Sequence, residues 1–338
     1  MKKYLLPQNG NYYKANLHTH STVSDGGYTP EQFKAFYKEM GYSILCLTDH
    51  DLFVTHNDLT DDDFLMLNGC ELGIDGPWDD FAKRNGVAKV CHINVIATSP
   101  DMETPVCWHR TKYVPSYCEH NRKLVKVDES VPDYEREYSG KGISEIMRIA
   151  RENGFFVIYN HPTWSCEDYS DYMNYENMHA FEIMNSTCIC GGYEEHNERV
   201  FDDMLRGGKK LFCIGADDAH GKIPMGMCYV MVNAQKLEYK TVMESLMKGD
   251  FYSSEGPEIK NLYYEDGKVT IETSDAEEIR FSMGFRVAKR FKANKNETLN
   301  TATFELPKTD FPSYVRVTVT DKYGKHAYTN AYFTEDFK

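Results

Sequence analysis

Seven short segments rich in β-branched, aromatic and aliphatic residues recur through the first 220 residues, and helical or loop stretches separate most of them. Near-continuous apolar strands that alternate with helices are typical of a parallel sheet or barrel with both faces covered. The pattern therefore predicts an α/β fold. The predicted strands are residues 13–20, 42–50, 64–72, 91–98, 155–162, 180–186 and 210–220.

The first helix is marked at both ends. Thr29 and Gln32 form the pattern of a capping box, Pro30 takes the first helical position, and apolar residues repeat at helical spacing as far as Met40, after which Gly41 ends the helix. Weaker helical patterns end near glycines and predict helices over residues 142–153, 193–206 and 241–249.

Two segments depart from this alternation. About 43 residues, 99–141, separate the fourth strand from the next helix, and a loop of that length in a compact domain is usually functional or mobile. From residue 257 the chain reads as alternating strands with hairpin turns, which predicts a small antiparallel β-sandwich. We therefore expect one domain over 1–256, with 99–141 as a candidate lid, and a second over 257–338.

Composition narrows the function. A formal net charge of −14 without a long Lys/Arg block argues against general nucleic-acid binding but leaves room for a local phosphate site. No apolar run approaches the ~18 residues that cross a bilayer, and the start MKKYLLPQNG is too short for a signal peptide. Ten cysteines without a CxxC pair are typical of a reducing compartment. These features predict a soluble cytoplasmic protein without membrane contact.

Most of the predicted strands end in residue types that bind metals. Because the carboxyl ends of parallel strands converge on one face, residues far apart in sequence are expected to meet there. His92 is the exception: it lies near the beginning of its strand, which leaves the boundary of that strand open. The strand-end residues are His18, His20, Asp49, His50, Glu71, Asn160, His161, Asp218 and His220.

Strand periodicity divides these residues. Residues two apart share a face, so His18 pairs with His20 and Asp218 with His220. Asp49 and Asp217 point out of phase with the neighbouring histidines, and we expect them to orient imidazoles rather than to bind metal. Asp25, on the turn after the first strand, can fold back over the same face.

The resulting candidate set holds six imidazoles and three carboxylates. It is too large for one tetrahedral ion but suits two or three divalent ions bridged by carboxylate and hydroxide. Three such ions against three carboxylates leave a formal +3, and two leave +1; either excess attracts a phosphate ester. Ligands of these types do not choose between Zn, Mn and Fe. The candidate metal ligands are His18, His20, Asp25, His50, Glu71, His92, His161, Asp218 and His220.

The motifs HTHSTVSDG, LTDHD, GCEL, the histidine of CHI, YNHP and GADDAH resemble, in order and spacing, those of the PHP (polymerase and histidinol phosphatase) superfamily. The similarity extends from residue 14 to roughly 256. It implies a distorted (β/α)7 barrel with a two- or three-metal site formed by the nine residues above, and phosphoester hydrolysis. A barrel followed by a small β domain looks most similar to the stand-alone predicted metal-dependent phosphoesterases of that superfamily.

Candidate substrate-binding residues are less sharply marked. Arg110 and Lys112 lie in the long loop and Lys222 follows His220, so each is placed to clamp a phosphate. Each also fits a solvated loop or turn. Trp78 and Trp108 are placed either to stack on a ring or to pack the loop. The remaining histidines fit no strand end and are expected to be ordinary: His56, His109, His120, His179, His196 and His326.

The sequence therefore predicts a metal-dependent phosphoesterase that cleaves a small phosphomonoester or phosphodiester, such as a nucleotide or sugar phosphate, by attack of metal-bound hydroxide. Asp218 or a metal-bound water would manage proton transfer, with His220 beside it. One alternative is a metal hydrolase that acts on an amide or lactone. Another is a binding or scaffold module with a vestigial metal site. The oligomeric state stays open.

Overall fold

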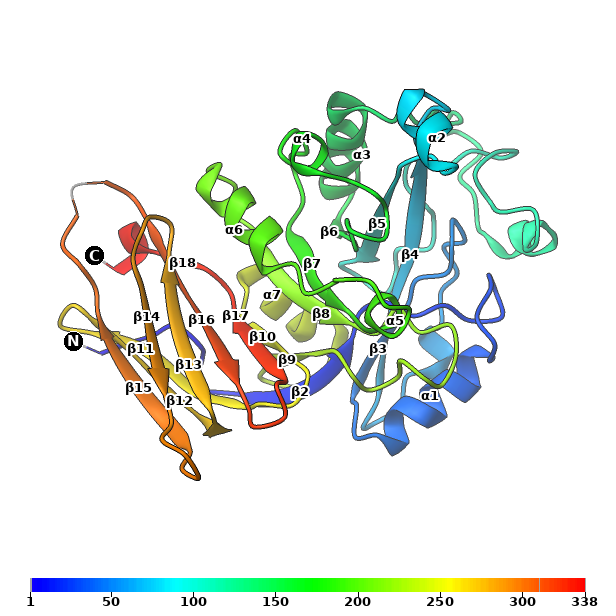
Figure 1. The fold of residues 1–338 in the computed structure, drawn as a ribbon. Coiled ribbons are helices and arrows are strands. Elements are labelled where there is room, and N and C mark those ends of the chain that lie inside the picture. The colour runs from blue at the N-terminus through cyan, green and yellow to red at the C-terminus, as the bar shows by residue number, and fades with distance from the viewer. Residues whose placement is uncertain (1, 310, 338) are drawn as a thin grey trace.

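The computed structural model describes residues 2–309 and 311–337, so the predicted domain ends at residues 1 and 338 lie outside the described residues. Figure 1 shows an N-terminal part with helices around a curved sheet, and a β-rich C-terminal part beside it. No helix within the described ranges is long and apolar enough to cross a membrane.

One sheet runs through both parts of the molecule. Its strand order begins with β14 (Ala288–Lys292), β13 (Glu278–Met283), β16 (Tyr314–Thr320) and β17 (His326–Thr329) and continues as β10-β9-β2-β3-β4-β5-β6-β7-β8, and β18 (Tyr332–Phe333) pairs with β16. In the N-terminal part its strands are β2 (Asn11–Asn16), β3 (Ile44–Leu47), β4 (Leu65–Asp75), β5 (Val90–Ala97), β6 (Phe155–Tyr159), β7 (Ala180–Asn185), β8 (Phe212–Ala216), β9 (Tyr229–Ala234) and β10 (Phe251–Ser254).

Each of the seven predicted strands overlaps one strand from β2 to β8, but the prediction of a wholly parallel sheet is wrong at β5. The pairings β2–β3, β3–β4, β6–β7 and β7–β8 are parallel, whereas β5 is antiparallel to both of its neighbours. The beginning of an antiparallel strand lies beside the ends of its parallel neighbours. His92 accordingly pairs with Gly73 near the end of β4, so its early position in β5 brings it to the same edge as the other candidates.

The two ends of this seven-strand stretch approach each other beyond the strands. An isolated parallel bridge joins Thr19, after β2, to Ala219, after β8. The Asp218 amide donates to the His18 carbonyl over 2.9 Å, and the His20 amide donates to the Ala219 carbonyl over 3.0 Å. The segments that carry the first and last predicted ligands are therefore held side by side.

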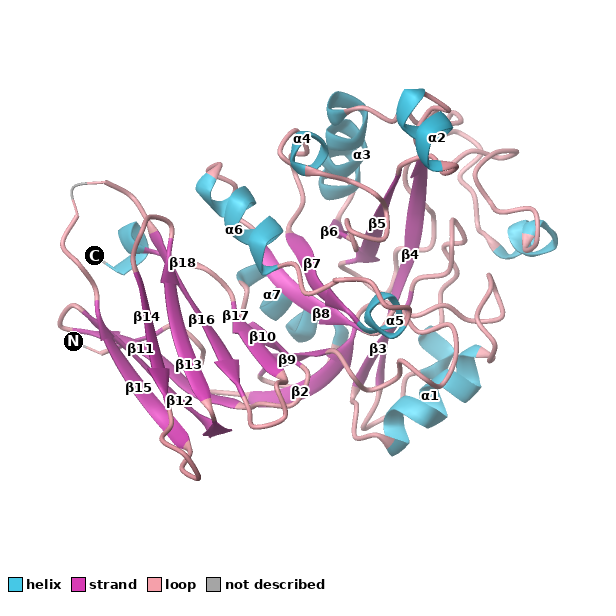
Figure 2. Cartoon of the chain, viewed as in Figure 1, coloured by secondary structure: helices cyan, strands magenta, loops and turns pink. Residues whose placement is uncertain are grey.

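Helices flank the sheet, as the cyan ribbons of Figure 2 show. The capping box of Thr29 and Gln32 is confirmed at the start of α1. The helix predicted over 193–206 begins only at Glu198, since the preceding residues fold as a loop. The helices are α1 (Pro30–Glu39), α2 (Asp80–Asn85), α3 (Gly140–Glu152), α4 (Tyr169–Tyr172), α5 (Ser186–Cys190), α6 (Glu198–Arg206) and α7 (Tyr239–Lys248), with 3-10 turns η1 (Asn57–Leu59), η2 (Glu119–Leu124) and η3 (Thr334–Phe337).

The C-terminal part contains the predicted antiparallel strands, arranged in two sheets. A four-stranded sheet has the order β1-β11-β12-β15, and the remaining strands extend the large sheet through the β10–β17 pairing. The N-terminal strand β1 thus pairs within the C-terminal part. The strands are β1 (Lys3–Tyr4), β11 (Ile259–Glu265), β12 (Lys268–Ala276), β13 (Glu278–Met283), β14 (Ala288–Lys292), β15 (Leu299–Glu305), β16 (Tyr314–Thr320), β17 (His326–Thr329) and β18 (Tyr332–Phe333).

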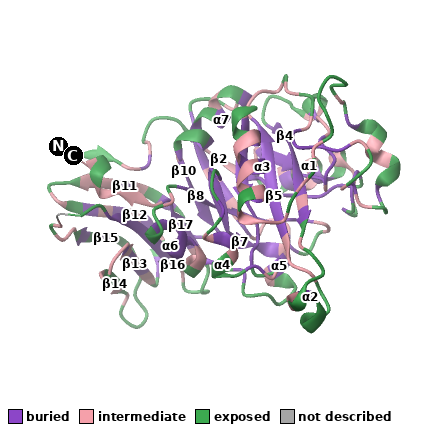
Figure 3. Ribbon diagram, turned by 90° about the horizontal axis from the view of Figure 1, so that it is seen from above, coloured by how far each residue is buried: buried purple, intermediate pink, exposed green. Residues whose placement is uncertain are grey.

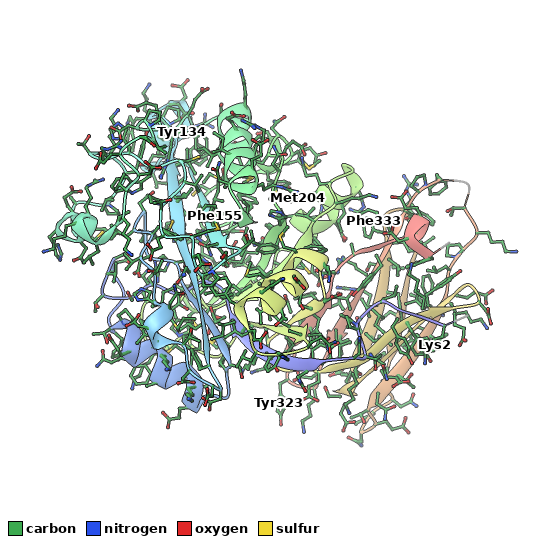
Figure 4. The ribbon with its side chains drawn as sticks, turned by 180° about the vertical axis from the view of Figure 1, so that it is seen from behind. Lys2, Tyr134, Phe155, Met204, Tyr323 and Phe333 are labelled. Atoms are coloured by element: carbon green, nitrogen blue, oxygen red, sulfur yellow. The ribbon has the colours of Figure 1, made fainter. Side chains whose placement is uncertain are left out.

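Strands β3 to β8 of the large sheet are buried along most of their length, as the purple ribbons of Figure 3 show, whereas the outer strand β14 is largely exposed. Phe155 and Met204 lie in the core beside β4 to β8, and Phe333 of β18 packs against the same core from the C-terminal part (Figure 4). Arg316 of β16 forms an ion pair of 2.8 Å with Asp202 of α6. The two parts of the molecule are therefore joined by a sheet, by a hydrophobic core and by an ion pair that they share.

Candidate functional site

The nine predicted metal ligands converge at one edge of the large sheet. Glu71 lies within β4 and His92 lies within β5. Asp25 lies in a turn, and the other six residues follow the ends of strands. Each belongs to at least one cluster whose ligand atoms lie within 4.8 Å of one another. The structure thus brings the nine side chains together, while metal binding by them stays a prediction. The clusters are His20, Asp25, His50 and His220; His18, Glu71 and His161; His18, His20 and Asp218; and His50, Glu71 and His92.

Glu71 is the centre of the arrangement. Its Oε1 atom lies 3.2 Å from a ring nitrogen of each of three histidines, and its Oε2 atom lies 3.1 Å from His50 Nδ1. Burial acts to raise the pKa of this carboxyl, but the His92 and His18 imidazoles outweigh it and hold the pKa well below its usual range. Glu71 is therefore an ionised carboxylate placed between two clusters. The three histidines at Oε1 are His18, His92 and His161.

The imidazoles respond to the same charges in different ways. Burial lowers the pKa of His20 to about 3, helped by His50 and His220. For His161, burial is outweighed by Glu71 and Asp218, which raise its pKa to about 9. The pKa of His220 is also raised to about 9, because the charges of Asp25 and Asp218 outweigh the effect of burial. The cluster is thus a dense set of mostly buried groups whose charges shift one another's pKa.

Three buried atoms of the cluster test whether the residues fit a cation. His20 Nδ1, His92 Nδ1 and Asp218 Oδ1 form no well-directed hydrogen bond within the part of the chain that the structure describes, although His92 Nδ1 lies 3.2 Å from Glu71 Oε1 and Asp218 Oδ1 lies 3.0 Å from His20 Nε2. A buried polar atom without a partner is costly, and native proteins rarely leave one. Imidazole nitrogen and carboxylate oxygen are the donor types that Zn, Mn and Fe accept. The donor set therefore fits divalent metal ions.

Glu182, in the middle of β7, is a site residue that the sequence prediction missed. Its Oε1 atom accepts a hydrogen bond of 2.9 Å from His18 Nδ1. Its Oε2 atom accepts from the His161 amide over 3.1 Å and from Asn185 Nδ2 over 3.0 Å. Since Nδ1 of His18 donates, Nε2 is left free to bind metal. A glutamate inside the apolar run AFEIMNS was the available signal.

Two amides orient the carboxylates. Asn160 Nδ2 donates to Glu71 Oε1 over 2.7 Å, and Asn185 Nδ2 donates to Asp218 Oδ2 over 3.1 Å. In Asp218 the second oxygen, Oδ1, is the buried atom without a hydrogen bond. Each carboxylate therefore keeps acceptor capacity directed toward the imidazoles.

Among the described residues, Asp49 and Asp217 accept hydrogen bonds from hydroxyls and backbone amides and none from an imidazole, so the prediction that they orient imidazoles is wrong. Asp49 accepts hydrogen bonds from the amides and hydroxyls of Ser21 and Ser24, which fixes the turn leading to Asp25. Asp217 accepts from the Tyr37 hydroxyl and from backbone amides of residues 226–228. Burial raises the pKa of Asp217 to about 6. Each of these aspartates directly precedes a candidate ligand, so its side chain points to the other side of the chain. Both carboxylates therefore bind the loops around the site.

A cavity of about 610 Å³ opens over the cluster. Residues of the predicted ligand set form its floor, and Tyr113, Pro115 and Tyr117 of the long loop form part of its wall. The Tyr117 hydroxyl lies 3.4 Å from Asp25 Oδ2. Trp164, after β6, and Tyr193, after α5, line it as well. The long loop thus overhangs the predicted face, while its action as a lid stays a prediction.

The three basic residues predicted to bind substrate lie elsewhere. Arg110 pairs with Asp133 at 2.7 Å and with Glu129 at 3.3 Å within the long loop. Lys112 pairs with Glu135 at 2.6 Å. The Lys222 ammonium lies over the Phe36 ring, 4.1 Å from its centroid. None of these three lines the cavity, because local carboxylates or an aromatic face hold each one.

A basic residue that the sequence prediction overlooked fixes the loop. Arg136 is buried and pairs with Asp51 at 2.6 Å. Its guanidinium also donates to the carbonyls of Gly73 and Cys107, and it lies 4.3 Å from the Tyr113 ring centroid. Asp51 directly follows His50, so this buried pair ties the long loop to the edge of the candidate metal site.

No family model and no curated protein matches the chain. In fold, the chain is similar to a two-domain protein of Bacteroides vulgatus containing a predicted PHP-like metal-dependent phosphoesterase, with 15% identity, 98% of each chain covered and a TM-score of 0.45. It is similar to a candidate metal-dependent phosphoesterase of Bifidobacterium adolescentis, with 16% identity, 64% and 90% covered, and a TM-score of 0.39. It is also similar to an amidohydrolase of Chromobacterium violaceum with bound sulfate and no metal, with 13% identity, 61% and 87% covered, and a TM-score of 0.38. At these identities and TM-scores the likeness carries no argument about activity.

Proposed function

We propose that this chain is a metal-dependent phosphoesterase that hydrolyses a small phosphomonoester or phosphodiester, such as a nucleotide or sugar phosphate. The observation that carries the proposal is the convergence of nine metal-ligand side chains, three of which have a buried atom without a hydrogen bond. We extend the proposal to the fold: the curved stretch from β2 to β8 is a distorted (β/α)7 barrel, and residues 257–338 are its β-sandwich domain.

The sharing of residues between clusters supports two or three ions of Zn, Mn or Fe. His18, His20, His50 and Glu71 each belong to two clusters. A single ion cannot use all four clusters, whereas neighbouring ions can share a carboxylate such as Glu71. The residues of the four clusters would thus hold the ions.

Charge favours a phosphate substrate. Asp25, Glu71 and Asp218 carry three negative charges among the proposed ligands, and buried Glu182 adds a fourth beside His18. Two divalent ions bring this set to neutrality and three leave a formal +2. A site with excess positive charge stabilises the charge that develops on phosphoryl oxygens. When the negative charge of Glu182 is counted with the other three, three divalent ions match a phosphate ester better than two.

The protein side chains have separate tasks. Divalent ions, when bound, supply Lewis-acid chemistry that lowers the pKa of water and polarises phosphoryl oxygens. Glu182 and the Asp218 carbonyl fix the ring orientations of His18 and His220, because each accepts from the Nδ1 atom over 2.9 Å. Asp218 and the His220 ring line the cavity, and the His220 ring, about one-third exposed, is placed to take and return protons there.

A small-molecule phosphate ester is the partner we propose. The net charge of −14 disfavours general nucleic-acid binding. All ten cysteines, which lie within the described ranges, are free of disulfides. Free, mostly buried cysteines support our proposal of a reducing, cytoplasmic location.

The test combines metal analysis with turnover. The double variant His18→Ala/His20→Ala is expected to lose bound metal and activity on a panel of phosphate esters, whereas His120→Ala keeps both. Because both replaced rings are buried, Asp25→Asn serves as a milder variant, checked by circular dichroism for retained fold. Full turnover in the double variant would disprove the proposal.

Metal-loaded native protein that is inert on every phosphate ester but active on an amide or lactone would support the non-phosphate alternative. Negligible metal in the native protein would instead support a binding module.

A further inference from the structure

Aromatic side chains from three separate segments surround the mouth of the cavity. Tyr117 of the long loop is 55% exposed, Trp164 after β6 is 41% exposed, and Tyr193 after α5 is 46% exposed. Large apolar rings left in contact with water around one cavity are typical of a ligand site rather than of core packing. These three rings therefore give a ligand in the cavity an exposed aromatic surface to contact.

Trp164 packs its ring against two of the predicted metal ligands. Its indole is 5.1 Å from the His161 ring at an interplanar angle of 87°, and 5.4 Å from the His92 ring at 44°. Both histidines belong to clusters that contain Glu71. A ligand group that contacts Trp164 is thus directly beside the place where the scissile phosphate would be held.

The backbone around Trp164 is held by a buried carboxylate. Glu195 accepts hydrogen bonds from the amides of Thr163 and Trp164, over 3.2 and 3.1 Å, and from Asn197 Nδ2 over 2.6 Å. Glu195 itself is fully buried. This arrangement explains why residues 193–197 form a loop instead of the first turn of a helix. It also means that the backbone that carries the indole is fixed before any ligand arrives, which lowers the entropy cost of binding.

The charge of the cavity wall sets a second condition. Its lining includes five carboxylates and, within the described residues, no lysine or arginine. Three of the five belong to the proposed metal ligands, and Asp51 is paired with Arg136. Asp75, two residues beyond Gly73, has no ion pair within the described ranges. A further negative charge on the substrate beside the exposed Asp75 would be repelled by it, and no lysine or arginine of the lining offsets that repulsion.

We propose that Trp164 determines specificity: it stacks on a planar, unsaturated ring of the leaving group, and that leaving group carries no negative charge beyond the scissile phosphate. This inference rests on the proposed phosphoesterase function and names its substrate class. A ring with an attached phosphate fits the 610 Å³ cavity. Stacking on the indole would favour a planar ring over a saturated ring of the same size by about 5-fold in kcat/KM.

The first experiment compares benzyl phosphate with cyclohexylmethyl phosphate on the metal-loaded protein. Both esters release a primary alcohol of similar size, so they differ mainly in the planarity of the ring. The native protein is expected to prefer the benzyl ester. Trp164→Leu should remove the preference and Trp164→Phe should keep most of it. Trp78→Leu is the matched control, because Trp78 is 61% exposed and does not line the cavity. Equal kcat/KM for the two esters in the native protein would overturn the inference.

The second experiment varies charge on the same ring. Benzyl phosphate should exceed 4-carboxybenzyl phosphate in kcat/KM by about 3-fold, because Asp75 is exposed and water screens its charge, and Asp75→Asn should narrow that gap. Asp80→Asn, an exposed aspartate of α2 outside the cavity lining, should leave the gap unchanged. A gap that Asp75→Asn leaves intact would overturn the charge condition.

A binding measurement separates failure of this inference from failure of the proposed function. Benzylphosphonate and cyclohexylmethylphosphonate, which cannot be hydrolysed, are titrated into metal-loaded native protein and Trp164→Leu by calorimetry. Tighter binding of the benzyl compound that depends on Trp164, together with no turnover of any phosphate ester, would support the ring site and disprove the phosphoesterase function. Turnover of phosphate esters without a preference for the planar ring or for the uncharged ring would support the phosphoesterase function and disprove the ring site.

Discussion

Glu182 and His18 are joined by a buried hydrogen bond of 2.9 Å between Oε1 and Nδ1, with both side chains fully shielded from solvent. A carboxylate that accepts from one ring nitrogen fixes the tautomer of the imidazole and raises its basicity at the other nitrogen. In His18 that other nitrogen, Nε2, lies 3.2 Å from Asp218 Oδ1 and from Glu71 Oε1, at the meeting point of two clusters.

Replacing Glu182 should therefore weaken metal binding without removing a ligand. Glu182→Gln is expected to lower metal affinity by about 10-fold to 100-fold, because the amide nitrogen introduces a donor where the His161 amide and Asn185 already donate. Competition with a chromogenic chelator measures the change. Glu176→Gln, an exposed glutamate, is the control. Unchanged affinity in Glu182→Gln would show that the His18 ring is oriented by other contacts.

The nine candidate ligands could be predicted from sequence because residue type and position coincide. Histidines and carboxylates stand at the ends of apolar segments, and parallel strands bring such ends together. The direction of β5 could not be predicted, since an apolar run reads the same in a parallel and an antiparallel strand. His92 consequently looked misplaced in sequence, although its position at the start of β5 is what brings it to the site.

Residues that support the ligands were predicted less well, for a physical reason. Glu182 belongs to a strand that contributes no ligand of its own, so only its charge within an apolar run marked it. Arg110 and Lys112 were chosen because their loop overhangs the site. Their carboxylate partners lie some 20 residues further along the same loop, a conformation that local sequence does not specify. Arg136 pairs with Asp51, which lies far outside the loop, and local sequence does not specify that contact either.

Removing the buried Arg136 guanidinium should destabilise the protein strongly. Arg136→Met leaves Asp51 buried without its partner, and breaking a buried ion pair in this way costs about 3–5 kcal/mol. Arg110→Met removes pairs on the surface and should cost less than about 1 kcal/mol. Urea unfolding followed by circular dichroism compares the two. Similar losses in both variants would contradict the assignment of Arg136 as the anchor of the long loop.

The three basic residues outside the cavity should be dispensable for substrate binding. Arg110→Ala, Lys112→Ala and Lys222→Ala are each expected to change KM by less than about 2-fold on any phosphate ester that the native protein hydrolyses, since none lines the cavity. Steady-state kinetics on the metal-loaded variants provides the measurement. A rise in KM of about 10-fold in any of them would mean that the loop rearranges on binding and brings that residue to the phosphate.

Glu167 should make stability depend on pH in the opposite direction to an ordinary carboxylate. Its side chain is buried and accepts from the hydroxyls of Tyr138, Tyr159 and Tyr175. Burial raises the pKa of Glu167 from 4.5 to about 7, against these hydroxyls and with help from Asp171. The folded state thus holds a proton that the unfolded chain releases between pH 4.5 and 7. Stability from this group is complete below pH 4.5 and is lost as pH rises toward 7.

The isosteric variant Glu167→Gln isolates that contribution. As pH rises from 4.5 to 7, the native protein should lose about 3 kcal/mol of unfolding free energy relative to the variant, since each pKa unit is worth about 1.4 kcal/mol. Urea unfolding at several pH values, with the metal content kept constant, gives the difference. Glu258→Gln, at an exposed position, should show no such trend. A difference between native protein and Glu167→Gln that stays constant across this range would show that Glu167 is already ionised in the folded state.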